Sequence, residues 1–501
     1  MNFPILSIIL LLPAVGAAII IAFPWLQLRG IRMVALAFTL VPLALALTLY
    51  ILWSTGDIGF ADLEEKRQWI PSINAFYHLG VDGLSLPMVL LTTLLGSLAV
   101  LVSWKVPTRQ REYFAWLLVL ETGILGVFTS LDLLLFFLFW EVELIPMYML
   151  ISIWGTGRRE YSAIKFVTYT LLGSALMLTG ILALYFSTGS FSMLELANLS
   201  SASLTRQVLP LSTIFLLIFA AFAIKLPMFP FHTWLPDAHT DAPTAVSVIL
   251  AGVLLKMGGY GMIRILVGIF PQQARDFAPL AVALAVVSVL YGAAVTLRQT
   301  DLKRLIAYSS VSHMGYVLLG IFALTPTSLT GATLQMFSHG LVTGLLFALV
   351  GLVYDKSHER DLRRLGGLAR QMPIIAVVFS VAGLASLGLP GTSGFAAEFT
   401  TFVGSFTSPN VDDIKIYTLL GMLGIVVTAG YILWMLQRAF YGPPQEKFGD
   451  VPDASLLERV PIFTLMVAAV LVGVLPMLLT DVIREAPVIA RVGDVLALWP
   501  R

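Results

Sequence analysis

Residues 220–239 read AAFAIKLPMFPFHTWLPDAH, an apolar stretch that holds one lysine and three prolines. Pro227, Pro230 and Pro236 each lack a backbone N–H and disfavour a straight helix. Lys225 stands two residues before the first of them. A broken helix at membrane depth is tolerated only where protein or a water-filled cavity satisfies the freed backbone groups. The stretch therefore predicts an interrupted membrane helix with a charged residue beside the break.

A second stretch of this kind lies in the C-terminal half of the chain. Residues 386–402 read SLGLPGTSGFAAEFTTF, with a Gly/Pro-rich break followed by Glu398. Interrupted segments at corresponding positions of two halves point to inverted repeats with a transport site between them. Lys225 and Glu398 would then be related by pseudo-symmetry, each beside a break.

The composition excludes most other classes of protein. The chain has 501 residues, of which 58% are hydrophobic and 12% charged, and its mean hydropathy is +0.91. Soluble domains carry roughly 45–50% apolar and about 25% charged residues. The lack of cysteine excludes disulfides, Cys-ligated zinc and Cys-held iron–sulfur clusters. A net charge of +1 excludes a strongly basic nucleic-acid binder. These features predict a polytopic membrane protein whose redox centres, if any, belong to partners.

The apolar stretches predict an all-α membrane protein of about fourteen transmembrane helices, since each crossing needs ~20 apolar residues. Two sets of five, helices 4–8 and 9–13, would form repeats of inverted topology, with helices 7 and 12 interrupted. The predicted divisions are 1–110 for helices 1–3, 111–270 and 271–442 for the repeats, and 443–501 for a loop, helix 14 and a tail. The predicted spans are 3–23, 33–53, 83–104, 113–130, 131–153, 163–187, 209–231, 243–266, 277–297, 302–323, 328–354, 373–404, 412–440 and 460–482.

The distribution of basic residues predicts the orientation. The odd-numbered loops between these spans carry 19 Lys and Arg residues, and the even-numbered loops carry 6. Lys and Arg concentrate in cytoplasmic loops. We therefore expect the odd-numbered loops in the cytoplasm of a bacterial plasma membrane or an equivalent energy-transducing membrane, with both termini on the other side.

Several ionisable residues fall inside the predicted spans. Lys225 and Lys256 are far from the helix ends, and a charge at the bilayer centre costs about 2.5–3.5 kcal/mol on insertion scales. The others are Glu121, Glu141, Glu143, Glu398, His313 and His339. Together they are candidates for a proton relay, while buried structural ion pairs and helix–helix hydrogen bonds are the alternatives.

The two carboxylates of the fifth span cannot face the same partner. Glu141 and Glu143 are two residues apart, so their side chains point about 200° apart on a helix. One of them can pair with a buried lysine while the other faces a second contact or another subunit. The spacing does not choose between them, and the role of Glu143 stays open.

Two further histidines flank the Trp-Leu-Pro turn of the seventh span. His232 and His239 are possible accessory residues, either at a proton entry or as a pair of metal ligands. Because no cysteine and no ordered acidic cluster accompany them, no metal site is predicted. The sequence also lacks a Ser/His/Asp elbow, an HExxH motif and a phosphate-binding Gly loop.

Four segments resemble the antiporter-like subunits of respiratory complex I, and the M type among them most. They are LLLFFLFWEVELIPMYMLISIWG (133–155), FAIKLPMFPFHTWLPDAHTDAPTAVSVILAGVLLKMGGYG (222–261), DLKRLIAYSSVSHMGYV (301–317) and GLPGTSGFAAEF (388–399). Residues 80–440 carry the resemblance strongly. It implies fourteen helices with an inverted five-helix repeat and proton pumping driven by redox chemistry elsewhere.

The resemblance also implies roles for individual residues. Glu141, the glutamate of the Trp-Glu pair, would form an ion pair with Lys225, and Lys256 would be the central lysine. His313 and His339 would continue the relay to Glu398, its terminal residue. Glutamate at 398, where the L and N types have lysine, favours the M type, as does the short chain after the fourteenth span.

The resemblance implies partners that hold the cofactors. No cofactor is expected in this chain, and flavin, iron–sulfur clusters and quinone would belong to other subunits. This chain would contact those subunits through L- and N-type neighbours in the bilayer. Two alternatives remain: a subunit of a multi-subunit Mrp-type cation/proton antiporter, and a non-pumping scaffold whose buried charges serve assembly. The electron donor and the quinone type are not predicted.

Overall fold

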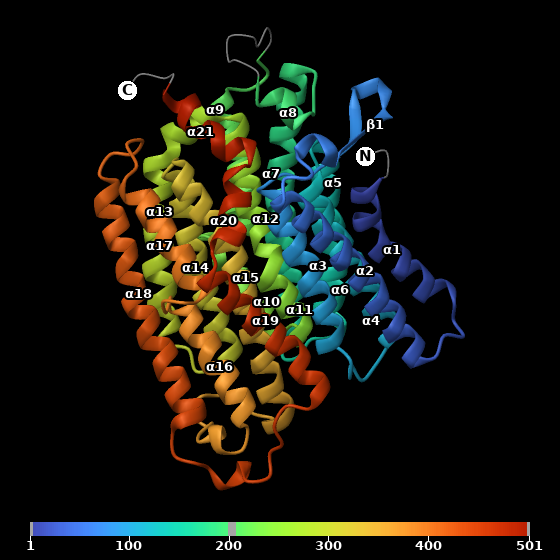
Figure 1. The fold of residues 1–501 in the computed structure, drawn as a ribbon, viewed down its shortest axis with the longest axis vertical. Coiled ribbons are helices and arrows are strands. Elements are labelled where there is room, and N and C mark those ends of the chain that lie inside the picture. Colours follow the sequence, from blue (N-terminus) through green and yellow to red (C-terminus); the bar gives the residue numbers. More distant parts are fainter. Residues whose placement is uncertain (1–3, 199–206, 498–501) are drawn as a thin grey trace.

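Long apolar helices run side by side along the long axis of the structure, a computed structural model that describes residues 4–198 and 207–497 (Figure 1). Within these residues, 12 helical segments are long and apolar enough to cross a membrane. Two shorter apolar helices, Leu211–Lys225 and Pro373–Ser386, are the first parts of predicted spans 7 and 12. The predicted all-α polytopic fold of about fourteen helices is therefore confirmed, with twelve long spans and two that begin with a shorter helix.

The bounds of the elements follow the predicted spans closely. The first half of the chain contains α1 (Ile5–Ala22), α2 (Leu28–Ser54), β1 (Glu64–Ile70), β2 (Ala75–Gly80), α3 (Ser85–Val102), α4 (Gln110–Thr129), α5 (Leu133–Val142), α6 (Leu144–Trp154), α7 (Arg159–Thr188), α8 (Met193–Leu196), α9 (Leu211–Lys225), α10 (Trp234–Asp241), α11 (Thr244–Ile249) and α12 (Leu255–Gly261). The second half contains α13 (Pro271–Thr296), α14 (Leu302–Phe322), α15 (Pro326–Ser357), α16 (Pro373–Ser386), α17 (Ser393–Phe406), α18 (Ile414–Leu436), α19 (Leu456–Val474), α20 (Met477–Arg484) and α21 (Pro487–Ala497).

Both predicted interruptions are present. Helix α9 ends at Lys225 and α10 begins at Trp234, with the prolines in between. Helix α16 ends at Ser386 and α17 begins at Ser393, across the Gly/Pro segment. The predicted end of span 14 at residue 482 is wrong, because α19 stops at Val474 before Pro476 and α20 is a separate helix. The inverted repeat and the boundaries between the repeats stay predictions.

Two irregularities in the helices were not predicted. The fifth span is divided at Glu143 into α5 and α6. The eighth span, residues 244–267, contains two π-helical segments, Leu250–Leu254 and Met262–Val267, on either side of α12. Single π turns inside α-helices are rare and are found mostly at functional sites. Both irregularities lie next to buried ionisable residues.

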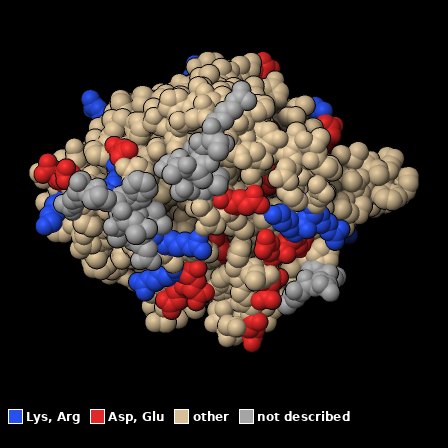
Figure 2. All heavy atoms as spheres, turned by 90° about the horizontal axis from the view of Figure 1, so that it is seen from above, with Lys and Arg blue, Asp and Glu red and all other residues tan. Residues whose placement is uncertain are grey.

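One end of the bundle holds the hairpin of β1 and β2, the beginning of α1 and the C-terminal helix α21 (Figure 1). This end corresponds to the predicted non-cytoplasmic side. Charged side chains of both signs lie close together on it, between areas without charge (Figure 2). The hairpin is tied to the bundle by Asp132, which caps α5 and accepts a hydrogen bond from the backbone N–H of Phe76 at 3.1 Å.

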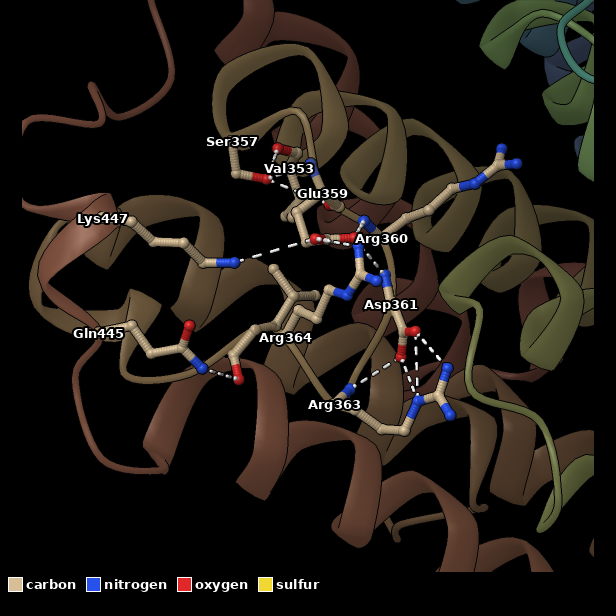
Figure 3. Close-up of polar contacts among 10 residues, drawn as sticks. Val353, Ser357, Glu359, Arg360, Asp361, Arg363, Arg364, Gln445 and Lys447 are labelled. Carbon is tan, nitrogen blue, oxygen red and sulfur yellow. Dashed lines mark hydrogen bonds and ion pairs between the residues drawn. The ribbon is translucent and has the colours of Figure 1, made fainter.

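A charged loop between α15 and α16 closes part of the opposite end. Glu359 pairs with Arg364 and Lys447, and Asp361 pairs with Arg363 at 2.6 Å (Figure 3). Arg360 pairs with Asp301 at 2.6 Å and donates to the carbonyl of Thr240 at 3.1 Å. The loop is therefore bound both to the start of α14 and to the end of α10.

Candidate functional site

Most of the predicted relay residues lie in the interior of the bundle. Lys225, Lys256, His313, His339 and Glu398 are buried, each with at most 4% of its surface exposed. Glu141 differs from them, because it is half-buried and lies on the same face of α5 as the exposed side chain of Leu138.

The buried ion pair of Lys225 is formed with Glu143 and not with Glu141. The Lys225 ammonium donates a hydrogen bond to Oε1 of Glu143, and the two side chains are each 1% exposed. The predicted pairing with Glu141 is wrong in this structure, because the helix turns Glu141 to the outer face. Oε1 of Glu141 is buried without a hydrogen-bond partner among the described residues.

Aromatic rings surround the ion pair. The Nζ atom of Lys225 lies 5.3 Å from the ring centre of Trp140 and 5.4 Å from that of Phe166. Such contacts stabilise a desolvated cation by about 2 kcal/mol or more. They add to the attraction of Glu143 and hold the ammonium at the end of α9.

Local sequence explains why Glu143 lies at a junction. Pro146 has no backbone N–H, so it cannot bond to the carbonyl of Val142, and α5 ends there. Gly123 of α4 packs against the backbone of Glu143, where an added Cβ would lie 3.1 Å from its nitrogen. Proline and glycine together let α4 approach the junction closely. Pro146 was the sequence signal that could have revealed it.

Lys256 lies between the two π-helical segments. Its ammonium donates to the carbonyl of Ala251, five residues earlier, and lies 2.7 Å from Nδ1 of His339. A π turn widens the helix and changes which backbone carbonyls are free. The irregular backbone thus supplies a partner for a buried cation and directs it toward α15.

The contacts continue from His339 to the second interrupted helix. The rings of His339 and His313 have centres 5.6 Å apart. His313 lies 3.3 Å from Glu398 through Nδ1 and 3.3 Å from the Ser386 hydroxyl through Nε2. A small cavity joins these groups and is lined by Gln335 and Ser338 as well as by His313, His339, Ser386 and Glu398.

Gly388 makes room for the Glu398 carboxylate. Its φ of +78° is unfavourable for other residues, and an added Cβ would lie 2.8 Å from Oε2 of Glu398. The glycine therefore serves both the turn between α16 and α17 and the close approach of the carboxylate.

The site consists of two clusters. Lys225 and Glu143 form the first, and Lys256, His339, His313 and Glu398 form the second. No hydrogen bond links the two lysines within residues 4–198 and 207–497. The helices that carry them do touch, since Gly258 packs against the backbone of Phe222 and Leu226.

The accessory histidines do not lie together. His232 contacts the ring of Tyr291 at 5.1 Å, whereas His239 stacks on Phe347 at 4.5 Å. Among the described residues, no group of three or more His, Asp or Glu side chains is placed to hold a metal ion.

A third buried charge pair, which sequence reasoning missed, joins the segment between β2 and α3 to the end of the eighth span. Asp82 forms two hydrogen bonds with Arg264, at 2.6 and 2.7 Å. Burial alone would raise the pKa of Asp82, but Arg264 and the backbone N–H groups of Ser85 and Leu84 outweigh it and hold the pKa below its ordinary value. This pair fixes α3 against the helix of Lys256.

Comparison with known proteins identifies the class. A family described as NADH:quinone oxidoreductase/Mrp antiporter, TM, matches residues 130–426, and this chain belongs to that family. Its curated relatives include chain 4 1 of NAD(P)H-quinone oxidoreductase from Synechococcus elongatus, 44% identical over 486 residues, which are 96% of this chain and 90% of the relative. Subunit M of NADH-quinone oxidoreductase from Rhodobacter capsulatus is 42% identical over 496 residues, 96% of this chain and 94% of the relative. The resemblance to M-type antiporter-like subunits is thereby confirmed.

Solved structures agree with this assignment. A chain of respiratory complex I from Thermus thermophilus with bound NADH superimposes with a TM-score of 0.88 at 29% identity, covering 99% of this chain and 100% of that chain. A chain of the Mrp complex from Dietzia sp. DQ12-45-1b matches with a TM-score of 0.86 at 22% identity, covering 99% of both chains. The second likeness shows the fold alone.

Proposed function

We propose that this chain carries protons across the membrane as one subunit of a complex I-type oxidoreductase, coupled to quinone reduction elsewhere in the complex. The observation that carries the proposal is the series of contacts from Lys256 through His339 and His313 to Glu398. All four side chains are buried, and together with Lys225 they give the bundle titratable groups that a purely apolar fold does not need.

The chemistry of these groups suits proton transfer. Lys256 has an N–H aimed at Nδ1 of His339, so a proton can leave the ammonium and bind the imidazole. An imidazole can bind a proton at one nitrogen and release another from its second nitrogen. Nε2 of His339 is buried without a partner among the described residues and lies at the cavity shared with His313 and Glu398. Glu398 would be the last group before the exit.

The Lys225–Glu143 pair would control the first step. Unit charges about 6–7 Å apart interact by roughly 2–3 kcal/mol at an effective dielectric of about 20, which corresponds to a factor of about 30–150 in an equilibrium. When Glu143 is close, it stabilises the charge on Lys225. When Glu143 moves or becomes neutral, Lys225 loses that stabilisation and releases its proton toward Lys256.

The absence of cysteine from the chain bears on which cofactors its partners must hold. Its relatives are subunits of NAD(P)H-quinone oxidoreductases, and a chain without cysteine cannot hold their iron–sulfur clusters. We propose that flavin, clusters and quinone lie in other subunits and that L- and N-type neighbours flank this one. The location would be a bacterial plasma membrane or an equivalent membrane, with both termini on the non-cytoplasmic side.

The test is proton transfer by the intact complex in proteoliposomes. Lys256→Ala and His313→Ala should lower proton uptake per quinone reduced while the complex still assembles. Unchanged proton stoichiometry in both variants would refute the relay and favour a scaffold. Mass spectrometry of the chains that co-purify in mild detergent separates the remaining alternative: flavin and iron–sulfur subunits are expected, and only small hydrophobic partners would favour an Mrp-type antiporter.

A further inference from the structure

The imidazole of His313 lies across the break of the second interrupted helix. Its Nε2 atom is 3.3 Å from the hydroxyl of Ser386, the last residue of α16, and its Nδ1 atom is 3.3 Å from the carboxylate of Glu398 in α17. One ring, carried by α14, thus contacts both halves of the interrupted span. All three side chains are buried. Glu398 has a place in the proposed relay, whereas Ser386 has none so far.

The hydroxyl of Ser386 is bound differently from many hydroxyls of the bundle. Ser380, in the same helix, donates to the carbonyl of Ala376 at 2.7 Å, and Thr401 in α17 donates to that of Ala397 at 2.9 Å. Such a bond to the preceding turn uses the single proton of a hydroxyl. Within residues 4–198 and 207–497, Ser386 makes no bond of this kind, and its hydrogen-bond partner there is His313. Its O–H can therefore point toward the ring or away from it.

A hydroxyl can serve Nε2 of His313 in both of its protonation states. A neutral imidazole has one N–H and one acceptor nitrogen, and the hydrogen bond at one nitrogen decides which of them carries the proton. The ionised carboxylate of Glu398 can only accept, so it favours N–H at Nδ1 and leaves Nε2 to accept from Ser386. Once Nε2 binds a proton, its new N–H can donate to the oxygen of Ser386. A backbone carbonyl would suit the second state alone.

Glycines of the break hold Ser386 and Glu398 on either side of the ring. A Cβ added to Gly394 would lie 2.0 Å from the carbonyl oxygen of Ala385, so the start of α17 lies directly against the end of α16. Gly388, with its positive φ, turns the chain between them and leaves space for the carboxylate. The position of the hydroxyl is therefore set by the backbone of the break, while the direction of its proton is not.

The cavity shared by the two relay histidines also reaches Ser386. It measures about 10 Å³, close to the space that one water molecule needs, and it is lined by His339, His313 and Ser386 among other residues. The two imidazole rings do not touch, since their centres are 5.6 Å apart. Because Nδ1 of His313 faces Glu398, a proton that comes from His339 has to bind at Nε2, the nitrogen beside Ser386.

We propose that Ser386 is a positioning residue of the relay, whose hydroxyl holds the His313 ring with Nδ1 toward Glu398 and keeps Nε2 ready to bind a proton. The inference rests on the proposed function. In this step, Nε2 binds a proton that comes from His339, the hydroxyl turns to accept the new N–H, and Nδ1 releases its proton to the Glu398 carboxylate. One proton enters the ring and one leaves it, so the ring ends neutral, with its N–H bonded to Ser386.

Proton uptake by the intact complex in proteoliposomes tests this role. Ser386→Ala should lower proton uptake per quinone reduced severalfold, and Ser386→Thr, which keeps the hydroxyl, should restore most of it. The matched control is Ser380→Ala, which removes a hydroxyl of the same helix that donates to a backbone carbonyl and should leave uptake unchanged. The amount of assembled complex is measured for each variant. Normal uptake in Ser386→Ala, or equal losses in the Ala and Thr variants of a fully assembled complex, would overturn the inference.

A solvent isotope effect separates positioning from packing. Without its partner at Nε2, proton transfer at His313 should limit the initial rate of uptake. The ratio of the rates in H2O and D2O should then be higher in Ser386→Ala than in the wild type and in Ser380→Ala. Lower uptake with an unchanged ratio would mean that the substitution only disturbs packing, and the inference would be wrong.

The His313→Ala variant keeps this inference distinguishable from the proposed function. If His313→Ala lowers proton uptake per quinone reduced and Ser386→Ala does not, the positioning role is refuted and the relay stands. If His313→Ala has no effect either, the proposed function fails first.

Discussion

Replacing Glu143 by Gln distinguishes the two carboxylates of the fifth span. The substitution keeps the size of the side chain and removes the charge that faces Lys225, whereas Glu141→Gln changes a half-buried group on the outer face. Breaking a buried ion pair by removing one partner typically costs 3–5 kcal/mol, because the other charge stays buried without compensation. The aromatic contacts of Lys225 with Trp140 and Phe166 are present with and without the charge of Glu143, so they do not offset this cost.

A cost of about 3–5 kcal/mol corresponds to a factor of roughly 150–5000 in the population of charged Lys225. We therefore expect Glu143→Gln to lower proton uptake per quinone reduced strongly. Within this chain, Glu141→Gln should have a smaller effect. The assay measures internal pH in proteoliposomes together with quinone reductase activity and the amount of assembled complex. Normal pumping in Glu143→Gln combined with its loss in Glu141→Gln would refute the pairing and restore Glu141 as the functional partner.

Three further outcomes follow from particular contacts. Gly388→Ala places a Cβ in a positive-φ turn, 2.8 Å from Glu398, and should lower the thermal stability of the assembled subunit by an amount equivalent to about 1–3 kcal/mol; an unchanged melting temperature would contradict this. Asp82→Asn leaves Arg264 buried and unpaired and should cost about 3–5 kcal/mol of stability, measured by thermal unfolding at pH 8. Because the pKa of Asp82 is held below its ordinary value of 3.8, its contribution is complete above pH 4 and is lost as the pH falls further, so the difference between wild type and Asp82→Asn should be constant from pH 8 to 5 and shrink below pH 4. Arg363→Ala removes an exposed ion pair of the charged loop and should change stability by less than about 1 kcal/mol; a larger loss would mean that the loop bears more of the fold than its exposure suggests.

The sequence predicts the number of helices and the two interrupted ones because those features are local. An apolar stretch of about 20 residues and a Pro/Gly cluster each act within one segment. The break at Glu143 was missed because a single proline, Pro146, inside an otherwise continuous apolar run is common in membrane helices. No particular amino-acid composition marks the π turns around Lys256. They depend on the tertiary contacts of residues 250–267.

The residues of the site were predicted better than their contacts. Lys225, Lys256, His313, His339 and Glu398 were identified because ionisable residues inside a membrane span are expensive. Periodicity gave the directions of Glu141 and Glu143 relative to each other. It could not give the direction of Lys225 relative to them, because Lys225 lies on a different helix, α9. Lys303 and Arg264 were overlooked because both lie close to predicted loops, where a basic residue is ordinary. Both side chains are buried, and their partners lie in segments distant in sequence: Lys303 donates to the carbonyl of Ala242, and Arg264 donates to Asp82.

The π turn before Lys256 makes the site sensitive to the count of residues as well as to their identity. A π turn accommodates one more residue than an α turn over the same stretch of helix. Deleting one residue between 250 and 254 would allow a regular α-helix over that stretch and leave the segments on either side in their present directions. Lys256 would still face His339, but the carbonyls before it, which now include the acceptor of its ammonium on Ala251, would return to regular α-helical bonding. The extra residue of the π turn is thus a part of the site that no single side chain encodes.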